Sequence, residues 1–460
     1  MASRSSRKAG QCLGSFSVCE SRDCHIKILV RRGGSDGHPA CDTPMVTLAG
    51  SRIASVAAET ALPKAFRQGT HRIVPPSETL ARYRPLASSM GITRLGNITG
   101  LDRIGIPVVV AVRPNSRSVS VSQGKGLDLS QAMTSALMEA IEGFHAEQVG
   151  EGRRAAYREL ARDGIVVDPL TLSTTGRRFD VAASISWLEG FDLLRQEPCW
   201  LPAEIVHTDY TRAFDGYFLA GSNGLASGNH LVEAVSSAVC ELVERDAVAL
   251  WSTSGIRARA RRALDIASVE DPDCLALLAK YDTAGIHVRI WNVTTDVGIA
   301  AFVCDIRDPS ADESRRLRHF HGAGCHPDRA IALARALSEA AQTRLTYIAG
   351  IRDDLPPPEY EEPPSADIVD ALLDALRRES EPHVFPEVPS FAADDLGRDL
   401  RWELEQLRSA GITRVIAVDL TRPEFGVPVV RVVIPGLEGD VRHPHYVPGP
   451  RARRATAPPR

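Results

Sequence analysis

Three segments of the chain repeat one helical pattern, and this repeat constrains the fold more than any other feature. Each segment has a glycine-containing loop, then alanines seven and three residues before a glutamate, and a glutamate or glutamine three residues after it. The segments are SQGKGLDLSQAMTSALMEAIEGFHAE, SNGLASGNHLVEAVSSAVCELVERDA and GAGCHPDRAIALARALSEAAQTRL. Such internal similarity predicts three related units, each made of a glycine loop and a helix.

The first two of these helices carry two glutamates each. Offsets of three and seven residues share one helical face, so Glu139 and Glu142 lie beside the alanines of one helix, and Glu241 and Glu244 beside those of another. Like charges on a packed face repel and are costly to desolvate unless something positive compensates them. Four carboxylates could supply hard oxygen ligands for Mg²⁺, which binds phosphate oxygens. The alternative is that they are surface glutamates of amphipathic helices.

The glycine loops favour an anion site, because helix N-termini and glycine backbones bind anions. The GKG at 124–126 is no Walker loop, so a standard P-loop or protein-kinase site is unsupported. Glu142 and His145 superficially resemble an iron-binding pair, but Ala247 stands where the second helix would need a histidine. Arg245 and Arg344 could contact nucleotide phosphates or simply neutralise neighbouring glutamates.

Strand-like runs over 106–112, 185–191, 288–293 and 299–305 alternate with Ala-rich helical patterns, which predicts an α/β fold of mixed α+β type. The net charge of -4 provides no field that would recruit nucleic acid or anionic lipid. No apolar run approaches the ~20 residues that cross a bilayer. We therefore expect neither a nucleic-acid nor a membrane partner.

The nine cysteines are scattered and contain no C-x-x-C pair, so neither a zinc site nor a disulfide framework is indicated. A reducing cytoplasm fits this usage best. Four cysteines fall within the first 41 residues, and a metal knuckle there is conceivable, although their spacing matches no usual ligand pattern.

Periodicity and composition divide the chain into five parts. Residues 1–60 lack periodicity and are expected to be a disordered, dispensable leader. The main body is expected over 61–354, and the Pro-rich stretch LPPPEYEEPPS at 355–365 is expected to be a connector. Residues 366–440 are predicted to complete the domain with two helices and two strands. The basic tail 441–460 is expected to be flexible.

These motifs resemble the signature of YcaO-domain proteins. The resemblance covers roughly residues 64–440 and includes THRIVPPSETL, HPDRAIALARALSEAAQTRLTYIAGIRDD and VPVVRVVIPGLE. Among members of the family, the chain most resembles the subgroup associated with TfuA-type partners, and that subgroup is linked to peptide thioamidation. The resemblance implies an α/β ATP-binding fold with internally related glycine-loop and helix units. It also implies ATP and Mg²⁺ as cofactors.

The resemblance carries over to individual residues. Glu139 and Glu142 match the first metal-binding pair of the family. The second motif matches at five further positions, with the amide and the glutamates around Mg²⁺ and the arginine near phosphate: Asn229, Glu233, Glu241, Glu244 and Arg245. Arg344 matches a further nucleotide-contacting arginine. Upstream, Arg72 and Thr79 match a basic residue and a hydroxyl that contact nucleotide, with Lys64 and Ser77 as competitors.

The implied activity is ATP-dependent phosphorylation of a peptide carbonyl that leads to a thioamide. A TfuA-like protein is the expected partner, a peptide or protein is the expected substrate, and a homodimer is left open. Azoline-forming members commonly end in a Pro-x-Pro-x-Pro tail, whereas this chain has PGP at 448–450 and ends in TAPPR, which argues against azoline formation. The alternatives are an azoline-forming cyclodehydratase and a non-catalytic accessory protein for modification of a ribosomal protein.

Overall fold

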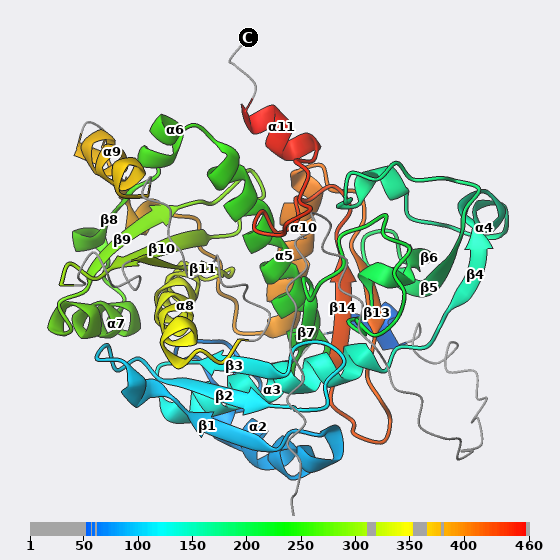
Figure 1. The fold of residues 1–460 in the computed structure, drawn as a ribbon, viewed down its shortest axis with the longest axis horizontal. Helices are drawn as coiled ribbons and strands as arrows, with labels where there is room; N and C mark the ends of the chain where they lie inside the picture. Colours follow the sequence, from blue (N-terminus) through cyan, green and yellow to red (C-terminus); the bar gives the residue numbers. More distant parts are fainter. Residues whose placement is uncertain are drawn as a thin grey trace, which may run out of the picture. The chain divides into compact units, whose positions relative to one another are not determined.

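The computed structural model describes residues 52–56, 58–59, 62–310, 319–352, 366–378 and 381–456. Helices and antiparallel sheets are interleaved along the chain, which confirms the mixed α/β fold. In three places a strand leads directly into one long helix that packs on it. These three strand–helix units form the centre of the fold (Figure 1).

The first unit is a three-stranded sheet covered by helix α3. The strands are β1 (Arg94–Asn97), β2 (Val108–Val112) and β3 (Val121–Lys125), in that order and antiparallel. Three residues after β3, the side chain of Asp128 caps α3 (Leu129–Glu147) by accepting from the Gln131 backbone N–H. Figure 1 shows this unit in cyan and blue.

The third unit repeats this arrangement. Strands β9 (His287–Asn292), β10 (Ala301–Arg307) and β11 (His319–Cys325) form an antiparallel sheet that precedes α8 (Arg329–Ala349). Asp328 caps α8 by accepting from the Ala330 backbone N–H, and again it lies three residues after the last strand residue.

The second unit takes its strand from a six-stranded sheet of order β4-β5-β13-β14-β7, with β6 also paired to β5. Its helix is α5 (Leu231–Thr253), capped by His230. The strands are β4 (Arg153–Ala156), β5 (Ser184–Asp192), β6 (Glu197–Pro202), β7 (Leu225–Ser227), β13 (Ile416–Asp419) and β14 (Val429–Val433). The C-terminal strands therefore lie between β5 and β7, so residues 366–440 complete this sheet and do not form a separate unit.

Close helix–strand contact explains the alanines and glycines of the repeat. A Cβ added at Gly124 of β3 would lie 2.3 Å from the Ala132 carbonyl oxygen of α3. At Gly324 of β11, an added Cβ would lie 2.1 Å from the Ala332 carbonyl oxygen of α8. The small residues on both surfaces let each helix lie directly on its strand.

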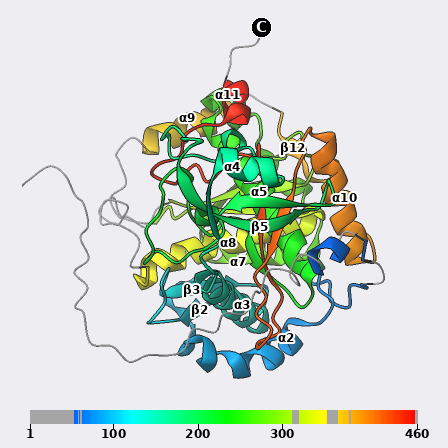
Figure 2. The same ribbon diagram turned by 90° about the vertical axis from the view of Figure 1, so that its right-hand side faces the viewer.

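The three units contact one another in a ring. Besides its own strand, α3 contacts β7, α5 contacts β11, and α8 contacts β3. Figures 1 and 2 both place α5 and α8 in the middle of the fold with α3 below them. The ring brings equivalent faces of the three helices to a common centre.

The remaining elements surround this ring. They are α2 (Pro76–Tyr83), α4 (Tyr157–Asp163), α6 (Ile256–Ala260), α7 (Pro272–Thr283), α9 (Ala366–Arg378), α10 (Leu396–Ser409), α11 (Pro450–Thr456), β8 (Leu264–Asp265) and β12 (His383–Val384). Strands β8 and β12 form a two-stranded parallel sheet. Helix α10 packs on α5, and α7 packs on α8.

Both chain ends differ from the sequence expectation where the structure describes them. Within the expected leader 1–60, residues 52–56 are helical, and Ile53 and Val56 belong to the hydrophobic core around α5 and α10. The expected flexible tail 441–460 contains α11, where Arg451 forms buried ion pairs with Asp246 of α5. Residues 1–51, the connector at 355–365 and residues 457–460 lie outside the described residues.

Candidate functional site

Equivalent glutamates of the three helices meet at the centre of the ring. Each accepts a hydrogen bond from the backbone of the strand in its own unit or, for Glu241, from the residue directly before that strand. Glu241 Oε2 accepts from the Gly224 N–H at 3.1 Å, and Glu339 Oε1 accepts from the Ala323 N–H at 3.2 Å. Glu139 bonds the Gln123 backbone in the same way. The repeat thus places one carboxylate of every unit against its strand.

Two further glutamates lie one helical turn along. Glu142 Oε1 of α3 accepts from the backbone N–H and from the hydroxyl of Ser227, at 2.8 and 2.7 Å, so it crosses to the strand of the second unit. Glu244 of α5 is buried. The third unit has Gln342 at this position, so the carboxylates are distributed unequally among the three units.

The pKa values of these carboxyls show that they share one electrostatic environment. Desolvation of the Glu139 carboxylate raises its pKa to about 7, and the negative charge of Glu241 contributes to this rise. Burial raises the pKa of Glu142 to about 8, with Glu139 and Glu241 adding to the effect. Burial, followed by Glu339, raises the pKa of Glu244. Taken as a whole residue, however, Glu139 is exposed, so desolvation acts on its carboxylate through close neighbours and not through enclosure. The structure therefore places Glu139, Glu142 and Glu241 in one electrostatic environment, with Glu244 beside Glu339 and Arg245.

Three cations balance part of this charge. Lys125 Nζ donates to Glu339 Oε2 at 2.7 Å. Arg245 lies 3.5 Å from Glu241 and 3.9 Å from Asp440. Burial alone would lower the pKa of Arg245, but the surrounding carboxylates raise it. Arg335 of α8 is held charged in the same way, chiefly by Glu244.

Burial would raise the pKa of Glu339, but Lys125 and Arg245 lower it to about 2. Its cationic neighbours therefore stabilise the ionised form of Glu339. Sequence reasoning did not select Lys125, Glu339 or Asp440. Glu339 could have been found, because it occupies the glutamate position of the third repeat; Lys125 and Asp440 lie outside the repeated helical pattern.

The donor set fits a hard divalent cation. Among the described residues, no three His, Cys, Asp or Glu side chains lie close enough to hold a metal ion by themselves. Mg²⁺ usually takes only one or two protein carboxylates and completes its coordination with phosphate oxygens and water. Burial and mutual repulsion leave Glu139 and Glu142 with raised pKa values, and a divalent cation would relieve that repulsion.

A second polar cluster lies at the start of α5. Glu233 accepts from the Ile73 backbone N–H at 2.6 Å and from the Asn229 N–H at 2.7 Å. The Thr79 hydroxyl donates to Asn229 Oδ1 at 3.0 Å. Arg72 is next to this cluster in sequence and donates to the His71 carbonyl at 3.1 Å. Four residues carried over from the family resemblance are thus adjacent in structure or sequence.

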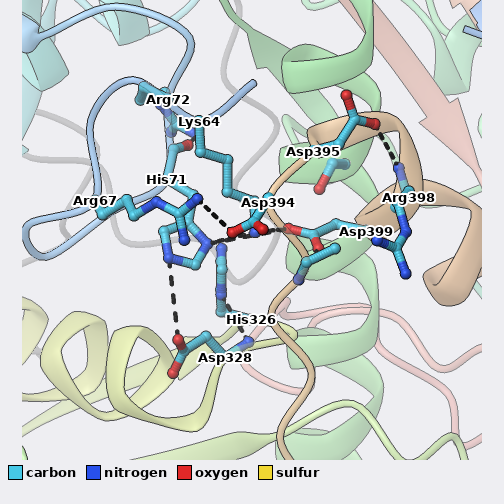
Figure 3. Close-up of polar contacts among 12 residues, drawn as sticks. Lys64, Arg67, His71, Arg72, His326, Asp328, Asp394, Asp395, Arg398 and Asp399 are labelled. Carbon is cyan, nitrogen blue, oxygen red and sulfur yellow. Dashed lines mark hydrogen bonds and ion pairs between the residues drawn. The ribbon is translucent and has the colours of Figure 1, made fainter. Parts of the chain in front are cut away.

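Lys64, the alternative to Arg72 as the nucleotide-contacting basic residue, makes contacts that support the fold. Its side chain is buried in an ion pair with Asp399 of α10 and lies 3.0 Å from His71 Nδ1 (Figure 3). Because the ammonium can only donate, His71 is neutral with its proton on Nε2, facing Asp328 at 4.0 Å. Burial lowers the pKa of His71 to about 3, in agreement with the neutral form. Ser77 is exposed.

Arg344 is in a different environment from the other predicted residues. Its guanidinium is buried and donates to Asp102 at 2.9 Å and to Asp308 at 3.1 Å. It lies five residues beyond Glu339, which rotates it about 140° around the helix. These contacts give no support to its expected role at a nucleotide.

The structure also bears on three weaker possibilities from the sequence: an iron-binding pair, a cysteine metal site and a membrane-spanning segment. His145 Nδ1 bonds the Ile141 carbonyl at 2.8 Å within α3, so it does not point to a partner metal ligand. The described cysteines are all buried, whereas Cys12, Cys19, Cys24 and Cys41 of the conceivable knuckle lie outside the described residues. None of the helices that the structure describes has the length and apolar character needed to span a membrane.

Comparison with known proteins identifies relatives of this chain. A family model described as YcaO cyclodehydratase, ATP- and Mg²⁺-binding, matches residues 123–438. An uncharacterized protein in the tfuA 3' region of Rhizobium leguminosarum bv. trifolii is 35% identical over 386 residues, covering 83% of this chain and 92% of the relative. An uncharacterized protein of Methanothermobacter thermautotrophicus is 36% identical over 375 residues, covering 79% of this chain and 94% of its own length.

Solved structures are similar over most of the chain. YcaO from Methanopyrus kandleri, bound with AMPPCP and Mg²⁺, has a TM-score of 0.67 and 25% identity, covering 84% of this chain and 98% of that one. A heterocyclase in complex with substrate and cofactor has a TM-score of 0.67 and 26% identity, covering 83% of this chain and 54% of that one.

Proposed function

Since this chain belongs to the YcaO family, we propose that it uses ATP and Mg²⁺ to activate a peptide backbone amide, and that a TfuA-like partner enables conversion of this amide to a thioamide. The observation that carries the ATP-dependent step is the meeting of glutamates from three helices beside Lys125 and Arg245. The tfuA 3' location of the Rhizobium relative supports the thioamide product.

In this proposal one set of residues binds the metal and another set binds the nucleotide. Glu139, Glu142, Glu241 and Glu244 would hold Mg²⁺, with Glu233 contributing from the start of α5. The metal would neutralise charge on the phosphates and orient them for in-line transfer. Arg245 is kept charged by its neighbours and would face the phosphates. Thr79, Asn229 and Arg72 would contact the nucleotide at the other end of this face of α5.

The chemistry requires ATP because an amide oxygen is a very poor leaving group. In the proposed reaction hydrosulfide adds to the carbonyl carbon, and the resulting oxyanion attacks the γ-phosphorus of ATP, with ADP departing. The C–O bond then breaks as C=S forms, and the S–H proton leaves with inorganic phosphate. The protein's own contribution is positioning and charge stabilisation in a site partly shielded from water.

The test is a reconstitution of the chain with a TfuA-like protein, ATP, Mg²⁺, sulfide and candidate peptides. ADP release coupled to replacement of one peptide oxygen by sulfur, read by mass spectrometry, is the expected result. ATP turnover with loss of one water from a peptide would instead support an azoline-forming cyclodehydratase, the second candidate, which the 26% identical heterocyclase structure favours. An absence of Mg²⁺-dependent nucleotide binding would contradict both enzymes and favour a non-catalytic accessory protein.

A further inference from the structure

The last strand residue of each unit is equivalent in the repeat, and it contacts the helix of the preceding unit in the ring. These residues are Lys125 of β3, Ser227 of β7 and Cys325 of β11. The Ser227 hydroxyl donates a hydrogen bond to Glu142 of α3, the free thiol of Cys325 lies beside the free thiol of Cys240 of α5, and Lys125 donates a hydrogen bond to Glu339 of α8. The ring therefore has three equivalent junctions, each closed by a different side chain.

Comparison of the junctions shows that packing does not require a lysine. A serine and a cysteine close the other two junctions. Both side chains are small, and each contacts the neighbouring helix through its hydroxyl or thiol. Lysine is longer, carries a charge, and loses side-chain entropy when it is ordered. Its presence at one junction of three calls for a reason other than stability of the ring.

Lys125 lies where a ligand can reach it. Its side chain is 19% exposed, and its only hydrogen bond among the described residues is to Glu339. An ammonium group has three donors, so two remain for other acceptors. The positive charge of Lys125 lowers the pKa values of Glu139, Glu244 and Glu339, which come from three different helices. The ammonium is thus close to carboxylates of all three units.

We propose that Lys125 binds the terminal phosphoryl group of the nucleotide and that Glu339 holds the lysine in place for this contact. This inference rests on the proposed function, because it assumes that the neighbouring glutamates hold Mg²⁺. The neighbouring glutamates would hold a metal that neutralises charge on the phosphates during transfer, so a cation beside these carboxylates would be next to the transferred group. A lysine is a point charge that suits a phosphate oxygen.

Glu339 is suited to position the lysine. Its carboxylate is fixed by the Ala323 backbone N–H on one oxygen and by Lys125 on the other. Its third-unit helix has Gln342 in place of a second glutamate, so this unit presents less charge to a metal than the other two. The third unit thereby contributes one carboxylate that holds the ammonium of the first unit, where the first two units contribute carboxylate pairs.

The test compares two nucleotides on two variants by calorimetry in the presence of Mg²⁺. Lys125→Met should bind AMPPCP roughly 10- to 100-fold more weakly than wild type, the loss expected for one charged hydrogen bond. The same variant should bind ADP within about twofold of wild type, because ADP lacks the terminal group. Glu339→Gln should bind AMPPCP a few-fold more weakly than wild type but more tightly than Lys125→Met, because the amide holds the Lys125 ammonium less firmly and leaves its charge in place. Lys280→Met is the matched control, because among the described residues the Lys280 ammonium donates to the Gly105 carbonyl and to none of the glutamates.

Three results would overturn the inference: unchanged AMPPCP affinity in Lys125→Met, equal weakening of AMPPCP and ADP, or a Glu339→Gln variant as weak as Lys125→Met. The last would mean that the ion pair acts as a structural unit. If Lys125→Met does not fold, the doubly neutral Lys125→Gln, Glu339→Gln variant takes its place with the same comparison. Failure of the wild type to bind AMPPCP with Mg²⁺ would overturn the proposed function itself, which distinguishes the two failures.

Discussion

The carboxylate of Glu241 has two roles: its charge would help to bind a metal, and its hydrogen bond to Gly224 stabilises the fold. Its Oε2 accepts from Gly224, and its Oε1 faces Arg245. Glu241→Gln keeps an acceptor for Gly224 and removes the charge. We expect Mg²⁺-dependent ATP turnover to be abolished while the free energy of unfolding changes by less than about 0.5 kcal/mol, because the lost attraction to Arg245 and the lost carboxylate repulsion are both small.

The measurement is ADP release beside a denaturant unfolding curve. Unchanged turnover would mean that Glu241 holds no metal, and a large loss of stability would mean that its role is structural. Glu204→Gln is a useful comparison for a buried glutamate held by backbone N–H groups, those of Gly216, Tyr217 and Phe218, away from the ring.

His145 gives a prediction about pH. Burial lowers its pKa from 6.5 to about 4, and its Nε2 is buried without a hydrogen-bond partner among the described residues. The unfolded chain takes up this proton below about pH 6.5, whereas the folded chain takes it up only near pH 4. Stability is therefore complete above pH 6.5 and falls as the pH drops toward 4, by as much as about 1.4 kcal/mol per pH unit for this residue.

His145→Phe should fit beside Phe144 and Phe425 and remove this proton uptake. Urea unfolding at pH 7 and pH 5 should show a smaller pH-dependent loss for the variant than for the wild type. Equal losses in the two proteins would show that His145 does not titrate as a buried neutral group. His71 and His207, whose pKa values burial lowers to about 3 and about 4, should keep the remaining acid sensitivity.

Individual residues of the site were predictable where the repeat carried them. Glu139, Glu142, Glu241 and Glu244 follow from helical spacing, because a helix fixes which residues share a face. The environment of Arg344 did not follow, since its partners Asp102 and Asp308 are remote in sequence and lie in segments without a recognisable pattern. Lys125 could not be selected either, because its importance depends on which helix closes the ring beside it.

At the scale of elements, the direct contact between helix and strand depends on glycine. Gly324→Ala would place a Cβ 2.1 Å from the Ala332 oxygen and 2.5 Å from the Ala336 nitrogen, both in the backbone of α8. Because backbone atoms cannot move aside alone, the helix must shift as a body. We expect a loss of about 3 kcal/mol in the free energy of unfolding. The matched control is Gly100→Ala, where an added Cβ meets nothing within 4 Å.

Thermal or denaturant unfolding of the two variants provides the measurement. Equal stability of both would show that α8 is not held against β11 as described. A shifted α8 would also displace Glu339, so Gly324→Ala should bind AMPPCP with Mg²⁺ more weakly than Gly100→Ala. This second readout connects the packing of one strand to the site at the centre of the ring.

The elements themselves were largely accessible from the sequence, and their pairing was not. The repeat predicted α3, α5 and α8, and the apolar runs predicted β2, β5, β9 and β10. The insertion of β13 and β14 between β5 and β7 could not be read from periodicity, because alternation of side chains fixes the faces of a strand and says nothing of its neighbours.

At the scale of the whole molecule, the core extends into the segment that the sequence suggested was dispensable. Ile53 is 1% exposed and belongs to the same core as Leu400 and Leu404 of α10. Ile53→Ala should lower the free energy of unfolding by about 2 to 4 kcal/mol through the cavity it leaves. Leu101→Ala, at a side chain that is 56% exposed, should change it by less than about 0.5 kcal/mol.

Denaturant midpoints of the two variants decide this prediction. Similar stability of Ile53→Ala and wild type would show that the segment before residue 60 is indeed dispensable. The sequence was misleading here because five residues of helix are too short for a periodic pattern to be recognised, and their burial depends on α10, which lies more than three hundred residues further along the chain.

The pairing of β5 with β13 has a consequence for how the protein is made. Asp192 and Ile416 are partners in the sheet, so β5 must wait for more than two hundred further residues before its neighbour leaves the ribosome. At about 5 to 20 residues per second this interval is roughly 10 to 45 seconds. During it, the nascent chain presents an unpaired strand edge, which is a template for wrong association. The six-stranded sheet, and with it the pairing of β7, which precedes α5, can form only after β13 and β14 have been made, so this edge of β5 stays open to wrong pairing until then.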